Sequence, residues 1–315
     1  MKIVMGYEGN RAGDAALADL RRAGLPSQGE MTVFTVADVW PSAEQIPPPD
    51  LVRAFPYVAQ SHVRTKKLLV KATGIAQRGA ARVRQILPGW RVTAEATADS
   101  PAWAIFKKAR DAGSDVVIVG SRPRSGFARW ILGSVSQKVL AECPGSVRIA
   151  RARAGSTGPV RILLAVDGSR DAECAVTQVL ERHWPANTAV RVIAVAEGRL
   201  QDASRTVPSI KKWVRSSDSD PNAWLGRYVE SVERRLVEKG LVATGRVREG
   251  NPKTVLLELA SRWRADAVFV GARGLGRWER IVLGSVSTAV AVRAPCSVEV
   301  VRSRGKGRSS TGERF

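Results

Sequence analysis

Short apolar runs alternate with helical patterns along the whole chain. In the carboxy-terminal half the apolar runs predict strands at 161–166, 189–195, 243–248, 267–271 and 297–301. The stretches between them predict helices near 171–182, 224–239, 253–263 and 286–293. The runs at 116–119 and 268–270 are apolar without interruption, as in strands that are buried on both faces of a parallel sheet. This alternation predicts a doubly wound α/β fold.

The same pattern occurs twice. The segments that begin at Gly120 and Gly271 lie 151 positions apart. Eight residues of the first segment recur at this offset in the second: Gly120, Arg122, Arg129, Leu132, Gly133, Ser134, Val135 and Ser136. Residues 2–10 likewise align with 161–169. Because the agreement at the offset of 151 runs without a gap and the starts of the two halves also align, we predict two tandem five-stranded parallel-sheet domains, 1–150 and 160–302.

The segments outside these domains have loop-like compositions. The stretch 151–159 is rich in small residues, Gly and Pro, and predicts a linker. The tail 303–315 is basic and lacks an apolar run, so it is expected to be disordered. The segments 40–60 and 199–223 align poorly between the halves and predict mobile loops after the second strand of each domain.

The strongest chemical signal is the pattern Gly271-x-x-Gly274-x9-Gly284-Ser285. Glycines let a backbone approach an anion closely and adopt positive φ. The amides that open the following helix then face the anion together with the Ser285 hydroxyl, and Ser285 is a suitable N-cap. The Walker and dinucleotide-binding patterns are both missing from the sequence. The alternative is a Gly-rich turn that only joins a strand to a helix.

With Asp167-Gly168-Ser169 closing the first strand of the second half, this pattern resembles the ATP-binding universal stress proteins, over nearly the whole chain and twice. The resemblance implies a Rossmann-like fold and bound ATP, with or without Mg²⁺ and with no metal ligand from the protein. It implies that loop residues hold the phosphates, the Asp holds the nucleoside end, and a Val packs on adenine. The implied residues are Ala165, Asp167, Val195, Gly271, Arg273, Gly274, Gly284, Ser285 and Val286. For Asp167 the alternative is an Asx-turn or a cap of the next helix.

The first half departs from this pattern. Pro123 replaces the second glycine of the loop, which removes an N–H group, and Glu8 stands where the second half has Asp167. The other site positions persist as Val36, Gly120, Gly133 and Ser134. We therefore predict a degenerate amino-terminal site that binds nucleotide weakly or not at all.

The resemblance also implies how the halves are arranged, since single-domain members of the family pair through their last strands. Here those strands are 146–150 and 297–301, in which Arg148 and Glu299 occupy equivalent positions. Opposite charges that face each other across two strands stabilise the pair by roughly 0.2–1 kcal/mol. We predict an intramolecular pairing of the halves. The alternatives are two separately solvated charges and a homodimer of the whole chain.

Composition narrows the class of protein. A chain of 315 residues with 44% hydrophobic and 25% charged residues is long enough for two globular domains. Three cysteines without a pairing pattern favour a reducing compartment and buried thiols. The sequence lacks a signal-peptide pattern and a long apolar run, so we expect a cytoplasmic protein that is not bound to a membrane.

The net charge and the small number of candidate catalytic residues rank three possible functions. The favoured function is that of an ATP- or adenine-nucleotide-binding stress-response or regulatory protein. An unidentified partner protein would recognise its nucleotide-bound state. The net charge of +21 supports a second possible function, that of a basic protein that binds polyanions or nucleic acid without sequence specificity. An adenylate-forming enzyme ranks last, because its loop motifs are missing. With only two histidines and no oriented partner for either, we expect at most slow ATP hydrolysis.

Overall fold

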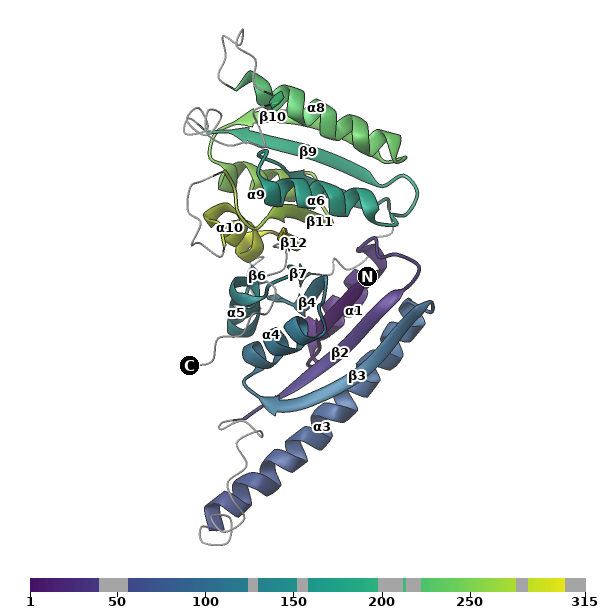
Figure 1. Ribbon diagram of the computed structural model, residues 1–315, viewed down its shortest axis with the longest axis vertical. Helices are drawn as coiled ribbons and strands as arrows, with labels where there is room; N and C mark the ends of the chain where they lie inside the picture. The colour runs from purple at the N-terminus through teal and green to yellow at the C-terminus, as the bar shows by residue number, and fades with distance from the viewer. Residues whose placement is uncertain are drawn as a thin grey trace, which may run out of the picture.

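The structure, a computed structural model, describes residues 1–39, 56–123, 130–151, 158–197, 212–213, 222–275 and 283–303. Figure 1 shows two α/β halves that meet end to end, with β7 and β12 at the junction. The tail beyond 303 and most of the predicted linker lie outside the described residues. So do 40–55, 198–211 and 214–221, which make up most of the predicted loops.

Each half contributes five parallel strands to the sheet. In the amino-terminal half they are β1 (Lys2–Gly6), β2 (Gly29–Asp38), β3 (Trp90–Asp99), β4 (Val116–Gly120) and β7 (Ser146–Ala150). In the carboxy-terminal half they are β8 (Arg161–Ala165), β9 (Ala189–Ala196), β10 (Val242–Glu249), β11 (Ala267–Gly271) and β12 (Ser297–Val301). The predicted strands of the second half are confirmed to within a residue at each end.

Helices cover both faces of the sheet (Figure 1). In the first half they are α1 (Arg11–Asp19), η1 (Leu20–Arg22), α3 (Pro56–Ile86), α4 (Pro101–Asp111) and α5 (Ser134–Glu142). In the second half they are α6 (Arg170–Glu181), α8 (Ala223–Glu238), α9 (Pro252–Arg262) and α10 (Ser285–Arg293). None of these described helices is long and apolar enough to cross a membrane. The loop predicted at 40–60 is wrong at its end, because α3 already begins at Pro56.

The two halves form one continuous ten-stranded sheet in the order β10-β9-β8-β11-β12-β7-β4-β1-β2-β3. The only antiparallel pair in that order is β12 with β7, which places Glu299 opposite Arg148. The predicted pairing of the halves through their last strands is therefore confirmed. One hydrophobic core, on the side of α4, α5, α9 and α10, crosses this junction and contains residues of both halves. On the other side each half has a core of its own, and the first half has a further small cluster of Ala37, Ala72 and Ala98.

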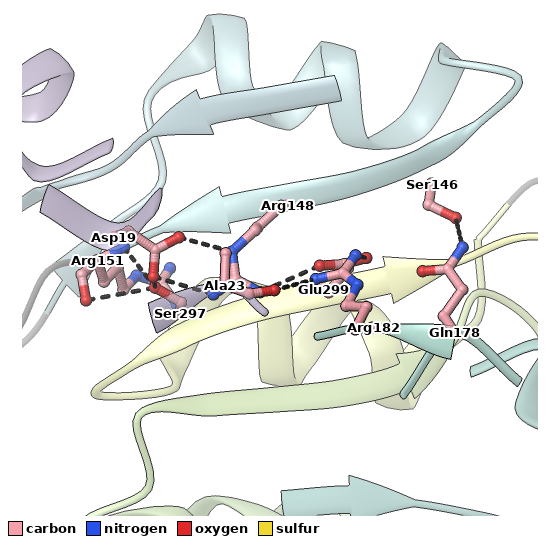
Figure 2. Close-up of polar contacts among 9 residues, drawn as sticks. All are labelled: Asp19, Ala23, Ser146, Arg148, Arg151, Gln178, Arg182, Ser297 and Glu299. Carbon is pink, nitrogen blue, oxygen red and sulfur yellow. Dashed lines mark hydrogen bonds and ion pairs between the residues drawn. The ribbon is translucent and has the colours of Figure 1, made fainter. Parts of the chain in front are cut away.

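The charges at the junction are buried rather than solvated (Figure 2). Arg148 donates through Nη1 to Glu299 Oε2 at 3.0 Å and through Nε to Asp19 Oδ2 at 2.6 Å. Arg182 pairs with the other oxygen of Glu299, and Ser297 donates to Asp19 Oδ1 at 2.7 Å. Burial alone would lower the pKa of Arg148, but the two carboxylates raise it. The opposed charges predicted from the sequence thus belong to a larger buried network.

Candidate functional site

A cavity of about 600 Å³ lies at the carboxyl ends of β8, β9 and β11, within the range of small-ligand sites. This is where ligands bind in open parallel sheets. The cavity brings together all nine predicted residues of the second half: Ala165, Asp167, Val195, Gly271, Arg273, Gly274, Gly284, Ser285 and Val286. The residues agree with the expected placement, while their binding roles stay predictions.

One side of the cavity is apolar. Ala165 and Val195 line it, as expected, at the ends of β8 and β9. Sequence reasoning missed Ile193, Leu256 and Val270, which complete this side from β9, α9 and β11. Alternation along β9 could have identified Ile193, which points to the same face as Val195. These five residues form the apolar side of the cavity, which we call the apolar slot.

The opposite side is the amino-terminal end of α10. The helix begins at Ser285, and Gly284 is the N-cap residue, with φ −75° and ψ 156° and no side chain capping the helix. The prediction that Ser285 is the N-cap is therefore wrong by one residue. Ser287 instead fixes this turn, because its buried hydroxyl donates to Ala272 O and contacts Gly284 O, both at 2.9 Å. The first amides of α10 are left facing the cavity, with the positive end of the helix dipole.

The glycines of the loop are required by close packing and not by positive φ. A Cβ on Gly271 would lie 2.7 Å from Ala172 N, so glycine lets β11 approach the start of α6. A Cβ on Gly274 would lie 2.7 Å from Asp167 Oδ2. Positive φ occurs instead at Gly168, where it is 80°. The expectation that the loop glycines adopt positive φ is therefore wrong for Gly271, Gly274 and Gly284.

Asp167 lies between the loop and the start of α6. Its Oδ1 accepts the N–H of Ser169 at 2.9 Å, which is the Asx-turn that was the alternative for this residue. It is not the helix cap, because Ser169 is the N-cap of α6 and accepts the N–H of Ala172. Burial raises the pKa of Asp167 above its ordinary value, against hydrogen bonds that lower it. Its second oxygen, Oδ2, faces Gly274 in the cavity wall.

Arg273 is anchored at the rim of the cavity. Its backbone N and its Nε both donate to Asp171 Oδ2 at 3.1 Å, and Ser303 N donates to the other oxygen of Asp171 at 2.9 Å. Burial would raise the pKa of Asp171, but the hydrogen bonds from Arg273 and Ser303 lower it. Asp171 was not predicted, since its position holds Ala12 in the other half. Arg273 therefore holds the loop in shape through Asp171.

The far end of α10 is held by the other half of the protein. The buried guanidinium of Arg151 donates to Ala294 O at 3.1 Å and Cys296 O at 3.3 Å, and it also binds the carbonyls of Ala291 and Val292. In the same way, Arg302 donates to Gly145 O at 3.2 Å and to Leu140 O, at the end of α5. Burial lowers the pKa of Arg151 to about 10. The sequence places Arg151 in the predicted linker and Arg302 at the end of the second domain. The two arginines are equivalent positions of the repeat, 151 residues apart.

The amino-terminal half contains an equivalent cavity of about 460 Å³. It brings together the five predicted positions of that half: Glu8, Val36, Gly120, Gly133 and Ser134. Glu8 is exposed and accepts a hydrogen bond from Asn10. The backbone at Arg122 and Pro123 pairs with residues 130–131 in a short antiparallel ladder, so those groups are engaged within the loop. This cavity is smaller than its counterpart.

No cluster of three or more His, Cys, Asp or Glu side chains that could hold a metal occurs among the described residues. Neither of the two histidines lines either cavity. Cys143 and Cys296 are buried, and burial raises the pKa of each thiol to about 12. Besides backbone and apolar groups, the described walls contain Asp167, Glu197 and Arg273 in the second half and Glu8 in the first.

The fold and the cavity define a doubly wound α/β protein with its site at the strand ends. The model of the universal stress protein family matches residues 1–151 and again 160–302. The chain therefore belongs to this family and contains two copies of its domain.

Individual relatives agree with this assignment. A family member from Staphylococcus haemolyticus is 32% identical over 142 residues, which cover 45% of this chain and 83% of the relative. A universal stress protein from Mycolicibacterium smegmatis is 27% identical over 218 residues, or 69% of this chain and 70% of its own. The crystal structure of a universal stress protein from Archaeoglobus fulgidus covers 96% of this chain and 98% of its own, with a TM-score of 0.66 and 21% identity. That likeness shows the shared fold.

Proposed function

We propose that the carboxy-terminal half binds an adenine nucleotide, ATP with or without Mg²⁺, and that the chain is a regulatory or stress-response protein rather than an enzyme. The observation that carries this proposal is the uncapped start of α10 opening into a cavity with an apolar slot on its other side. A helix start of this kind favours phosphate. The apolar slot suits a flat base.

The base and the sugar are assigned to the sheet side of the cavity. Adenine would pack between Val195 and Leu256, with Ala165 beneath it. The ribose would lie beside Asp167, whose carboxylate accepts hydrogen bonds when it is ionised. Asp167 already accepts hydrogen bonds from Ser169 and from the backbone of Leu275, and each carboxylate oxygen has a second lone pair with which it could accept a sugar hydroxyl.

The phosphates are assigned to the turn between β11 and α10. The amides of Ser285 and Val286 and the backbone at Gly274 line the cavity there. A loop backbone that is fixed before the ligand arrives loses little conformational freedom on binding. Asp171 and Arg273 supply this preorganisation. Any Mg²⁺ would be bound by phosphate and water, as Mg²⁺ sites with nucleotides usually are.

For the amino-terminal half we propose weak binding or none. Its cavity is smaller, its loop backbone is engaged in the ladder at Arg122 and Pro123, and its Glu8, the counterpart of Asp167, is exposed and bound to Asn10. Its role is then that of a partner that completes the shared core and holds α10 through Arg151.

The test uses the full-length chain, because separated halves would expose the buried charges of Arg148 and Glu299. Protein purified from cells is denatured, the released small molecules are identified, and ATP binding is measured by equilibrium dialysis on nucleotide-free protein. We expect an adenine nucleotide among the released molecules and one ATP bound per chain with high affinity. Protein that releases no nucleotide and binds none at saturating ATP would contradict the proposal.

A further inference from the structure

Four arginines form a strip on one face of the sheet in the carboxy-terminal half. The strand register puts Arg246 beside Ile193 and Arg248 beside Val195, and both apolar residues line the cavity. The strip therefore runs from the opposite end of the strands to the edge of the cavity. Its members, which we call the arginine strip, are Arg161, Arg191, Arg246 and Arg248.

This face is open where the strip crosses β10. The strand is the last of the sheet, and α8 packs on its other face (Figure 1). On the strip's own face, α9 lies over β8 and β9. Thr244, Arg246 and Arg248 are all exposed. A ligand can therefore reach the arginines from the side of α9.

The guanidinium groups of the strip lie close together, and in the described part of the chain no acidic side chain pairs with them. None of the four makes an ion pair with another residue that the structure describes. Arg191 lies 4.4 Å above the ring of Trp263, and Arg161 Nη1 donates to Trp263 O at 3.2 Å, so both guanidinium groups are held in place. Burial lowers the pKa of Arg191, and the charges of Arg161 and Arg248 lower it further. An anion bound there would relieve this repulsion.

The amino-terminal half provides an internal comparison. At the corresponding face its charges are neutralised: Arg91 pairs with Glu30 at 3.1 Å, and Lys108 pairs with Glu95 at 2.6 Å. Glu95 stands at the repeat position of Arg246. The strip therefore belongs to one half only and is not a general consequence of the fold or of the high net charge.

We propose that the arginine strip binds the phosphates of a single-stranded nucleic acid. Guanidinium groups match phosphate oxygens with two parallel hydrogen bonds, and all four residues are arginine. A row of cations beside an aromatic ring is the arrangement that follows a single strand. The choice of nucleic acid over another polyanion rests on the proposed nucleotide site, because the strip ends where that site begins.

The test measures anisotropy of fluorescein-labelled oligo(dT) and oligo(rU) with the full-length protein over a range of salt concentrations. The variant R246Q/R248Q removes two exposed charges of the strip. The control R91Q/R234Q removes two exposed charges elsewhere. Single strands lose about 0.7 in the slope of log K against log salt per phosphate contact. We expect R246Q/R248Q to reduce this slope by about 1.4 and the control to leave it unchanged.

Several results would overturn the proposal that the arginine strip binds nucleic acid. Equal losses in both variants, or no binding of oligonucleotide by the native protein, overturn the proposal. So does binding to phosphatidylserine vesicles or to poly-glutamate that depends on the strip while oligonucleotide binding does not. ATP affinity, measured in parallel, should be unchanged in R246Q/R248Q and lost in D167A. Oligonucleotide binding that depends on the strip in a protein unable to bind ATP would refute the nucleotide site and leave the strip standing.

Discussion

Arg148 and Glu299 lie opposite each other in the antiparallel pair of β7 and β12, with Nη1 3.0 Å from Oε2 and both side chains fully buried. They are the same position in two copies of one domain, and their opposite charges let the copies face each other across the junction. Two identical charges at this place would repel. The duplication thus allowed the two strands to specialise for each other.

Replacing Glu299 with Gln should destabilise the whole chain. Arg148 and Arg182 both pair with this carboxylate, and removing one partner of a buried ion pair costs about 3–5 kcal/mol. Urea unfolding measures the loss. The control is E258Q, which breaks an exposed pair with Arg262 and should change stability by at most about 0.5 kcal/mol. Equal effects of the two variants would show that the junction network adds nothing.

Replacing Arg151 with Met should weaken both stability and nucleotide binding. The variant leaves several carbonyls at the end of α10 unpaired, and each buried acceptor left unsatisfied costs about 1–3 kcal/mol. Since the other end of α10 faces the proposed phosphate site, ATP affinity should fall as well. R302M is the matched control, because Arg302 holds α5 of the other half. It should lower the melting temperature and spare ATP affinity. Equal ATP affinity in the two variants would contradict this role of Arg151.

The thiols should be unreactive in the folded protein. Cys143 and Cys296 are buried with pKa values raised to about 12, and the pKa of the half-buried Cys174 is also raised by burial. Reaction depends on the thiolate. A coloured disulfide reagent at neutral pH should therefore label none of the three quickly and all three after denaturation. Fast labelling of Cys143 or Cys296 in native protein would show that the core opens readily.

ATP affinity should depend on pH through Asp167. Because burial raises the pKa of this carboxyl, it becomes protonated at a higher pH than an exposed aspartate. The protonated form accepts sugar hydroxyls less well, so binding should weaken as the pH falls through the raised pKa and be complete above it. D167N should bind weakly and lack this part of the pH dependence, while protonation of ATP itself affects both proteins equally. Parallel pH profiles would remove Asp167 from the site.

Much of the fold could be predicted from the sequence because each half repeats the same strand and helix pattern. The alignment of the two halves also placed the site residues at strand ends, where they share a cavity. The position of the N-cap and the reason for glycine at 271 and 274 could not be predicted, since both depend on packing against α6 and Asp167. The roles of Asp171 and Arg151 depend on contacts between distant segments, which periodicity does not encode.

The most direct test of the central claim is calorimetric titration of ATP into three full-length proteins: native, D167A and E8A. Asp167 and Glu8 are equivalent positions of the two halves, so each variant removes one carboxylate at one candidate site. The account predicts one ATP per chain in the native protein and in E8A, and at least a tenfold loss of affinity in D167A, which corresponds to about 1.4 kcal/mol. Loss of ATP binding in E8A together with full binding in D167A would place the nucleotide in the amino-terminal half and contradict the proposed site.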